Sequence, residues 1–181
     1  MFKELKNCFL KVPDAVRDYA AANDPNTDES GATLPTYRDR LIGELRQEQA
    51  AMLNLIDTAL QAIEHGSHDE LGHHLSALDR LLKQHAQREQ TELYKALEAF
   101  VTHRQSKEAG FIRSSRDESR ILMHSVGIAL ERYAAMAMHQ TQVGTAPLVN
   151  LRIVLLDAFL DKQEHLYPLY QQYGSYGRTA V

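Results

Sequence analysis

The stretch that most constrains the fold is residues 69–106, where apolar side chains recur every three or four residues. Its stripe comprises Leu71, Leu75, Leu78, Leu82, His85, Glu89, Leu93, Ala96 and Phe100. This spacing predicts an α-helix that buries one face. His85 and Glu89 interrupt the stripe, and a buried imidazole or carboxylate is costly unless it is hydrogen-bonded, paired or bound to a metal. This face is therefore the best indication of a functional site.

Three further stretches show helical periodicity and complete a set of four long helices. They are residues 37–64, 112–140 and 147–173. We expect Asp69 to cap the helix of residues 69–106 and Gly110 to begin the break that follows it. Gln49 stands where an apolar residue is expected in the first helix. The last helix is apolar over most of its early surface, from Leu148 to Phe159, which predicts an element wedged between neighbours.

The fold class follows from these helices and from the absence of any alternating pattern typical of β-strands. Four long helices with short connections pack most simply as an antiparallel up-down four-helix bundle, so we predict an all-α fold. We divide the chain into an N-terminal helical arm and linker, residues 1–36, the bundle, residues 37–173, and a tail, residues 174–181. Two interpretations of the arm stay open: packing back onto the bundle, which we favour, and self-association.

Composition narrows the classes of partner and compartment. The formal net charge is −4, and the Lys and Arg residues are scattered, so we expect neither nucleic acid nor a membrane surface as a partner. The single cysteine, Cys8, excludes an internal disulfide and suits a reducing cytoplasm. The N-terminus lacks the apolar centre of a signal peptide. With no nucleophile elbow and no phosphate-binding glycine loop, we expect a protein that is not an enzyme.

The polar residues nearest the predicted bundle axis are candidate metal ligands. His85 and Glu89 lie one helical turn apart, so both could reach one ion, and Glu92 adds a donor further along. The third predicted helix offers His124, and the fourth offers Asp161 and His165. Inward-pointing carboxylate and histidine pairs are how di-iron bundles hold their metals.

These motifs resemble the hemerythrin-like, histidine–histidine–glutamate cation-binding family. Residues 46–53 resemble the family's first element, with Gln49 where the ligand histidine would stand. His85 and Glu89, followed by Glu92-Leu93-Tyr94, resemble its second element. The resemblance implies a four-helix bundle and a di-iron site.

The second half of the chain keeps only part of this pattern. Leu166-Tyr167-Pro168 matches, but Ser119, Ala158 and Lys162 stand at the remaining ligand positions. We therefore expect Lys162, where it lies close to Glu89 or Glu92, to form a buried salt bridge in the vacated metal position. The alternative is a rearranged site that binds iron, either one ion or two. Its ligands would be His85, Glu89, His124, Asp161 and His165.

Two functions follow from the resemblance. The one we prefer is a cytoplasmic regulatory or binding module without cofactor, which acts through a protein partner or self-association. The other is an iron-dependent sensor or carrier that responds to oxygen, nitric oxide or iron.

A second resemblance is to helical bundles of the regulator-of-sigma-D type. It rests on Asp39-Arg40-Leu41 and on the segment from Leu78-Asp79-Arg80-Leu81 to His85. This resemblance implies binding to the primary sigma factor, which is a second alternative in the class of interaction proteins.

Overall fold

The computed structural model describes residues 37–104, 106–138 and 144–178. The N-terminal arm predicted for residues 1–36 lies outside the described residues. Within them, the chain forms four helical rods, called the first to the fourth rod in chain order. They are α3 (Leu41–Glu64), α4 (His68–Arg88) with η1 (Glu89–Tyr94) and α5 (Lys95–Arg104), α6 (Ala109–Met138), and α7 (Ala146–Asp161) with η2 (Lys162–Leu166) and α8 (Tyr167–Arg178).

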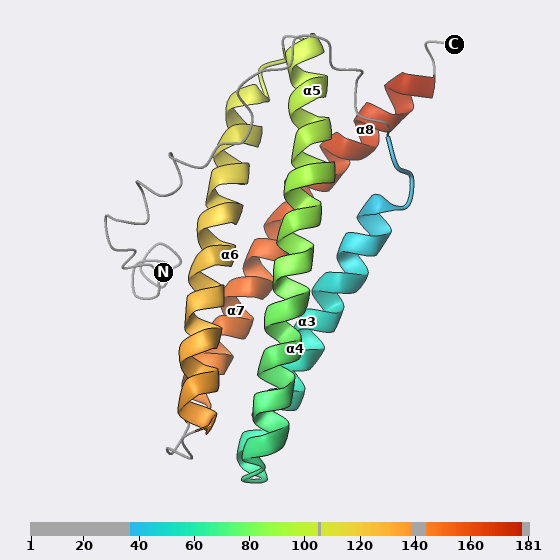
Figure 1. Ribbon diagram of the computed structural model, residues 1–181. Coiled ribbons are helices and arrows are strands. Elements are labelled where there is room, and N and C mark those ends of the chain that lie inside the picture. The colour runs from blue at the N-terminus through green and yellow to red at the C-terminus, as the bar shows by residue number, and fades with distance from the viewer. Residues whose placement is uncertain (1–36, 105, 139–143, 179–181) are drawn as a thin grey trace.

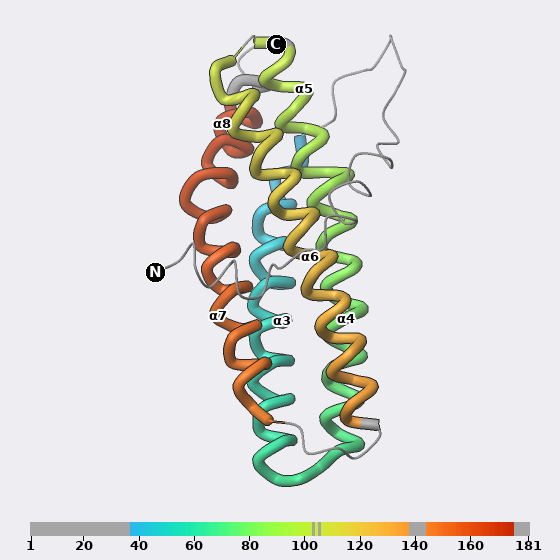
Figure 2. The backbone as a smooth tube through the Cα atoms, turned by 90° about the vertical axis from the view of Figure 1, so that its left-hand side faces the viewer, coloured from blue at the N-terminus to red at the C-terminus, as the bar shows by residue number. Residues whose placement is uncertain are grey.

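The rods run alternately up and down, so that each is antiparallel to the next in sequence (Figures 1 and 2). α3 packs against both α4 and α7, and α4 also packs against α6. The turn between α3 and α4 contains Gly66, whose φ is 68°. Glycine adopts this left-handed conformation without the steric penalty that a Cβ would bring. The described residues thus confirm an all-α protein of four helices in antiparallel packing.

Several boundaries differ from those expected. α4 begins at His68 with Ser67 at the N-cap position, and Asp69 lies in the first turn instead. A carboxylate there still interacts favourably with the positive end of the helix dipole. Gly110 lies inside the first turn of α6 and does not mark a break. α8 continues to Arg178, so residues 174–178 of the predicted tail are helical. The ring of Tyr37 occupies the space that a Cβ at position 174 would fill, so this position of α8 requires glycine.

The buried apolar side chains form two clusters along the length of the rods. The first includes Met52, Leu75, Leu82, Leu130 and Phe159. The second includes Leu41, Leu45, Leu97, Tyr167 and Tyr170. Along each rod, the residues between the two clusters are those that carry polar side chains into the core.

The fourth rod is less enclosed than its composition predicts. Leu148, Leu151, Leu155 and Phe159 of α7 are buried, but Val149, Ile153 and Leu160 are 41%, 44% and 47% exposed. The prediction of an element wedged between neighbours is therefore wrong, and α7 presents an apolar stripe outward. No described helix combines the length and the apolar character needed to cross a membrane.

Candidate functional site: a buried polar layer

A layer of polar side chains separates the two apolar clusters, and every rod contributes to it. Its members are Gln49 from α3, His85 and Glu89 from the second rod, Ser119 from α6 and Lys162 from the fourth rod, each at most 4% exposed. Charged groups this deep in a protein require close partners, because water cannot solvate them. The layer is thus the part of the described core where chemistry other than apolar packing is concentrated.

The centre of the layer is an ion pair between the second and fourth rods. Lys162 Nζ lies 2.8 Å from Oε1 and 2.6 Å from Oε2 of Glu89. Ser119 Oγ donates to Glu89 Oε2 at 2.9 Å and accepts from Lys162 Nζ at 3.0 Å. Both carboxylate oxygens and the ammonium are therefore engaged by protein groups. The salt bridge expected for Lys162 is confirmed, and its partner is Glu89, not Glu92.

His85 connects this ion pair to Glu48 of α3, in the first rod. Its Nδ1 lies 2.9 Å from Glu48 Oε2, and because a carboxylate only accepts, Nδ1 is the donor. Its Nε2 lies 3.1 Å from Glu89 Oε1 but lacks the geometry of a hydrogen bond. The ring meets Phe159 edge-on, with centroids 5.9 Å apart. The imidazole is thus held between two carboxylates and one aromatic ring.

The charge state of Glu89 follows from opposing effects. Burial raises the pKa of its carboxyl, but the Lys162 ammonium and the neighbouring His85 outweigh burial and lower the pKa to about 2. An opposite charge within hydrogen-bond distance favours the ionised form. Glu89 is therefore a carboxylate at neutral pH, paired with a cation that the chain itself supplies.

Two buried tyrosines flank the ion pair. Tyr167 accepts a hydrogen bond from Gln49 Nε2 at 2.6 Å, and Gln49 Oε1 accepts one from Gln163 Nε2 at 3.1 Å. Tyr94 donates to the carbonyl of Ser115 at 3.1 Å. Burial, and to a smaller extent the charge of Glu89, raises the pKa of both phenols. Both tyrosines therefore stay protonated.

Each partner of the ion pair begins a π-helical segment. η1 starts at Glu89 and ends with the pair Leu93-Tyr94, and η2 starts at Lys162 and ends at Leu166, which Tyr167 of α8 follows. A π-helical turn holds one more residue than an α-helical turn, so both members of each pair can be buried. Sequence reasoning missed these segments. The sequence feature that could have indicated them is the Leu-Tyr pair, which occurs in both halves of the chain.

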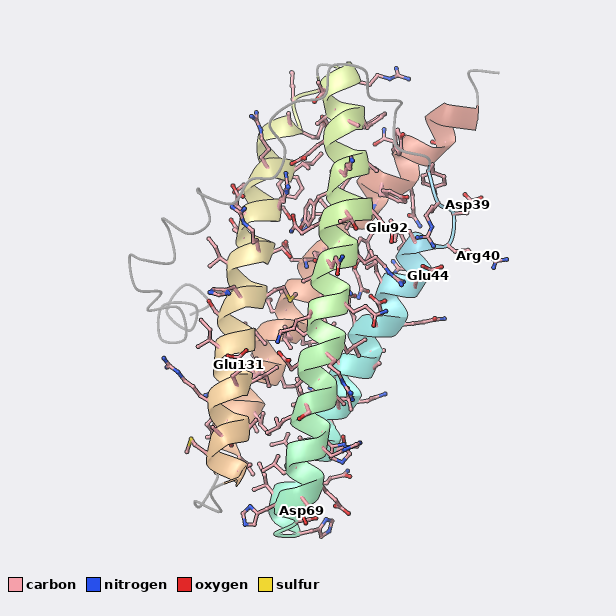
Figure 3. The ribbon with its side chains drawn as sticks, viewed as in Figure 1. Asp39, Arg40, Glu44, Asp69, Glu92 and Glu131 are labelled. Atoms are coloured by element: carbon pink, nitrogen blue, oxygen red, sulfur yellow. The ribbon has the colours of Figure 1, made fainter. Side chains whose placement is uncertain are left out.

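Glu92, predicted as a metal ligand, lies in a different environment. It pairs with Arg38, and its Oε1 lies 3.8 Å from Nε of Arg88. Arg88 Nη1 also lies 3.0 Å from Glu44 and 3.1 Å from Glu48. Figure 3 shows Glu92 facing the upper part of α3, where Glu44 lies. Glu92 therefore belongs to a partly exposed charge cluster between the first two rods.

The remaining candidate ligands also lie apart from the ion pair. His124 is exposed on α6. Asp161 and His165 are exposed on the fourth rod, with His165 Nδ1 3.4 Å from Asp161 Oδ1. Of the six predicted ligands, only His85 and Glu89 come together in the polar layer, and Asp161 and His165 form a separate, exposed pair. Across the ranges that the structure describes, no group of three or more His, Cys, Asp or Glu side chains is placed to hold a metal ion.

The donors that do come together fit a metal poorly. Both oxygens of Glu89 are occupied by Lys162 and Ser119, and an ammonium within 2.8 Å would repel a divalent cation. The fold and the layer define an all-helical protein of four antiparallel rods with an ion pair at its centre. No protein-family model, no curated protein and no solved structure matches the chain.

Proposed function

We propose that this chain is a hemerythrin-like four-helix bundle that acts in the cytoplasm as a regulatory or binding module and not as an enzyme. In this proposal the Lys162 ammonium takes the place of the metal ions that such a bundle would otherwise hold. The observation that carries the proposal is the position of Lys162 Nζ, 2.6 and 2.8 Å from the two oxygens of Glu89.

The chemistry of the layer supports this substitution. Glu89 and Lys162 stand at equivalent points of the two halves, each at the first residue of a π-helical segment. In a di-iron bundle the equivalent positions carry carboxylates that share the metal charge. Here one of the two positions carries a cation instead, so the charge of the remaining carboxylate is neutralised within the chain.

The binding role is supported by the outer face of α7. Val149, Ile153 and Leu160 recur at helical spacing and are each more than 40% exposed. Scattered apolar residues are ordinary on a protein surface, but a stripe along one helix is typical of surfaces that contact other proteins or other segments. This stripe is the surface that we propose for a protein partner or for self-association.

The test of the proposal is the metal content of the protein after growth in iron-rich medium. We expect iron far below one ion per chain by elemental analysis and no charge-transfer bands in the visible spectrum, before and after anaerobic reconstitution with ferrous iron. Iron near stoichiometry, with such bands, would overturn the proposal and establish the iron-dependent sensor or carrier.

A matched variant keeps this test interpretable. Lys162→Met removes the ammonium and leaves a side chain of similar length. If wild type is free of iron because the ammonium excludes it, Lys162→Met should take up more divalent metal than wild type does. Equal absence of metal in both proteins would show that Lys162 is not what excludes it.

A further inference from the structure

A groove of about 370 Å³ lies between the second rod and α6, and it borders the polar layer at Ser119. Its walls are largely apolar, formed by Leu82 and Ala86 from α4 and by Met123 and Ile128 from α6. Pockets for small molecules typically start at about 300 Å³ and combine apolar walls with a few polar groups. The groove therefore has the size and the lining of a small-molecule site.

Gly127 is the residue that opens this groove. It lies in the interior of α6, where glycine costs roughly 1 kcal/mol relative to alanine. Nothing lies within 4 Å of the position that its Cβ would take, so close helix packing does not require it. Gly174, in contrast, is required by the ring of Tyr37. The space beside Gly127 is part of the groove, which Gly127 also lines.

The two ends of the groove differ in charge. At one end Lys83 Nζ lies 3.8 Å from Glu131 Oε1, an ion pair between the two walls, and Figure 3 shows Glu131 on α6 beside α4. Arg120 lies eleven residues before Glu131, about 16 Å along the helix. Its Nη2 contacts Asp117 at 3.2 Å. Its Nε is buried and has no hydrogen-bond acceptor among the described residues.

The Arg120 side chain as a whole is 35% exposed, and a guanidinium carries five N–H donors, so its accessible N–H groups can donate to a ligand oxygen in the groove. Gln90 and Ser119 line the groove together with Arg120 and add polar atoms to this end. At the opposite end Lys83 is shared by two carboxylates, Asp79 and Glu131, so the net negative charge there would repel an anionic group. The groove is therefore suited to a ligand with an apolar body and an anionic oxygen group at the Arg120 end.

We propose that the groove binds a small amphipathic carboxylate, with its chain between Leu82 and Met123 and its carboxylate on Arg120. This inference deepens the proposed binding function by naming a site and a ligand class, and it rests on that function. Ser119 also belongs to the Glu89–Lys162 network, so a ligand at this end would lie one side chain away from the buried ion pair.

The test uses decanoate as the probe and isothermal titration of the full chain. We expect one decanoate per chain, loss of binding in Gly127→Leu, and binding about tenfold weaker in Arg120→Met, as for one lost charged hydrogen bond. Gly43→Leu is the matched control, since Gly43 also has open space at its Cβ but lies on α3. It should bind decanoate as wild type does. Decyltrimethylammonium should bind more weakly than decanoate.

Three results would overturn the proposal: no decanoate binding by wild type, unchanged affinity in Gly127→Leu, or equal affinity for the cationic probe. Circular dichroism checks the fold of each variant. If Gly127→Leu fails to fold, Ala86→Phe fills the same groove from α4 and must abolish binding in its place. Iron in the purified protein would contradict the proposed function without changing the decanoate titration, so the two failures are distinguishable.

Discussion

The contact between Glu89 and Lys162 places two opposite full charges in a layer that water does not reach. Such a pair gains little over apolar side chains of the same volume, because both charges lose their hydration. Removal of one partner is different, since it leaves the other charge buried and uncompensated. The ion pair is therefore a strong constraint on sequence at both positions and a weak source of net stability.

This asymmetry predicts opposite outcomes for single and double substitutions. We expect Lys162→Met to lower the free energy of unfolding by about 3–5 kcal/mol, and Glu89→Leu combined with Lys162→Met to restore most of the loss. Urea unfolding provides the measurement. Lys83→Met is the control, because the Lys83 side chain is exposed and its ion pair with Asp79 should contribute little to stability. A Lys162→Met variant no less stable than Lys83→Met would refute the argument.

A substitution at position 162 tests whether the polar layer can bind a divalent cation once the ammonium is removed. Lys162→Glu would place a second carboxylate opposite Glu89 and beside His85, which is a donor set for a divalent cation. Without metal this variant should be destabilised by like-charge repulsion. We expect added Co²⁺ or Zn²⁺ to raise its melting temperature by several degrees, through binding to the folded state alone. The wild-type melting temperature should not change. An equal increase in both proteins would place the metal elsewhere.

The charge of Glu89 also makes stability depend on pH. Its pKa is lowered from the ordinary value of 4.5 to about 2 in the folded protein. A lowered pKa means that the carboxylate stabilises the fold above pH 4.5, and that this contribution is lost as pH falls from 4.5 towards 2. We expect urea unfolding to show a steeper loss between these values in wild type than in the Glu89→Leu, Lys162→Met double variant. Equal slopes would show that Glu89 has no such role.

At the scale of single elements, periodicity predicted the four helical rods but not their exact buried faces. After Gln49, α3 buries Met52, Ala59 and Ala62, and the larger Leu53, Leu60 and Ile63 lie at the flanks of the core. Small residues at the centre allow closer approach of the neighbouring rods. A pattern of apolar spacing alone does not distinguish a central alanine from a flanking leucine, since both fit a broad helical face.

The candidate site was predictable in part for a similar reason. His85, Glu89 and Lys162 were identified because they interrupt or replace parts of a pattern, and the structure brings them together. Glu92 was placed by α-helical spacing, but the π-helical turn that starts at Glu89 changes the register after it. Tyr94 faces the core beside the expected Leu93, and Glu92 meets Arg38 and Arg88. The mark of such an insertion is a pair of adjacent buried apolar residues, which α-helical spacing alone does not predict.

Two glycines with equally open surroundings give a matched prediction at this scale. Neither Gly66 nor Gly127 has any atom within 4 Å of its missing Cβ, but Gly66 has a φ of 68°. Gly66→Ala should destabilise the protein by about 1 kcal/mol, because alanine is strained in this conformation. Gly127→Ala should stabilise it by up to about 1 kcal/mol, through helix propensity. Thermal unfolding of both variants measures the difference in sign. Two effects of the same sign would contradict this account.

At the scale of the whole molecule, the polar layer joins the two helical hairpins. Glu89 and His85 belong to the first hairpin and Lys162 and Ser119 to the second, so their contacts cross between the halves. Both apolar clusters also draw residues from rods of both hairpins. Neither half could bury its apolar face alone. We therefore expect the four rods to unfold as one cooperative unit.

This cooperativity predicts how a shortened chain should behave. A fragment of residues 37–178 contains every residue of the two clusters and of the polar layer. We expect it to retain the helical circular dichroism per residue of its four rods and to unfold in a single urea transition that fluorescence and circular dichroism report at the same midpoint. Two separate transitions would contradict a single cooperative unit, and a fragment without a cooperative transition would show that residues outside this range complete the core. The full chain, measured in parallel, gives the joint contribution of residues 1–36 and 179–181 as the difference between the two midpoints.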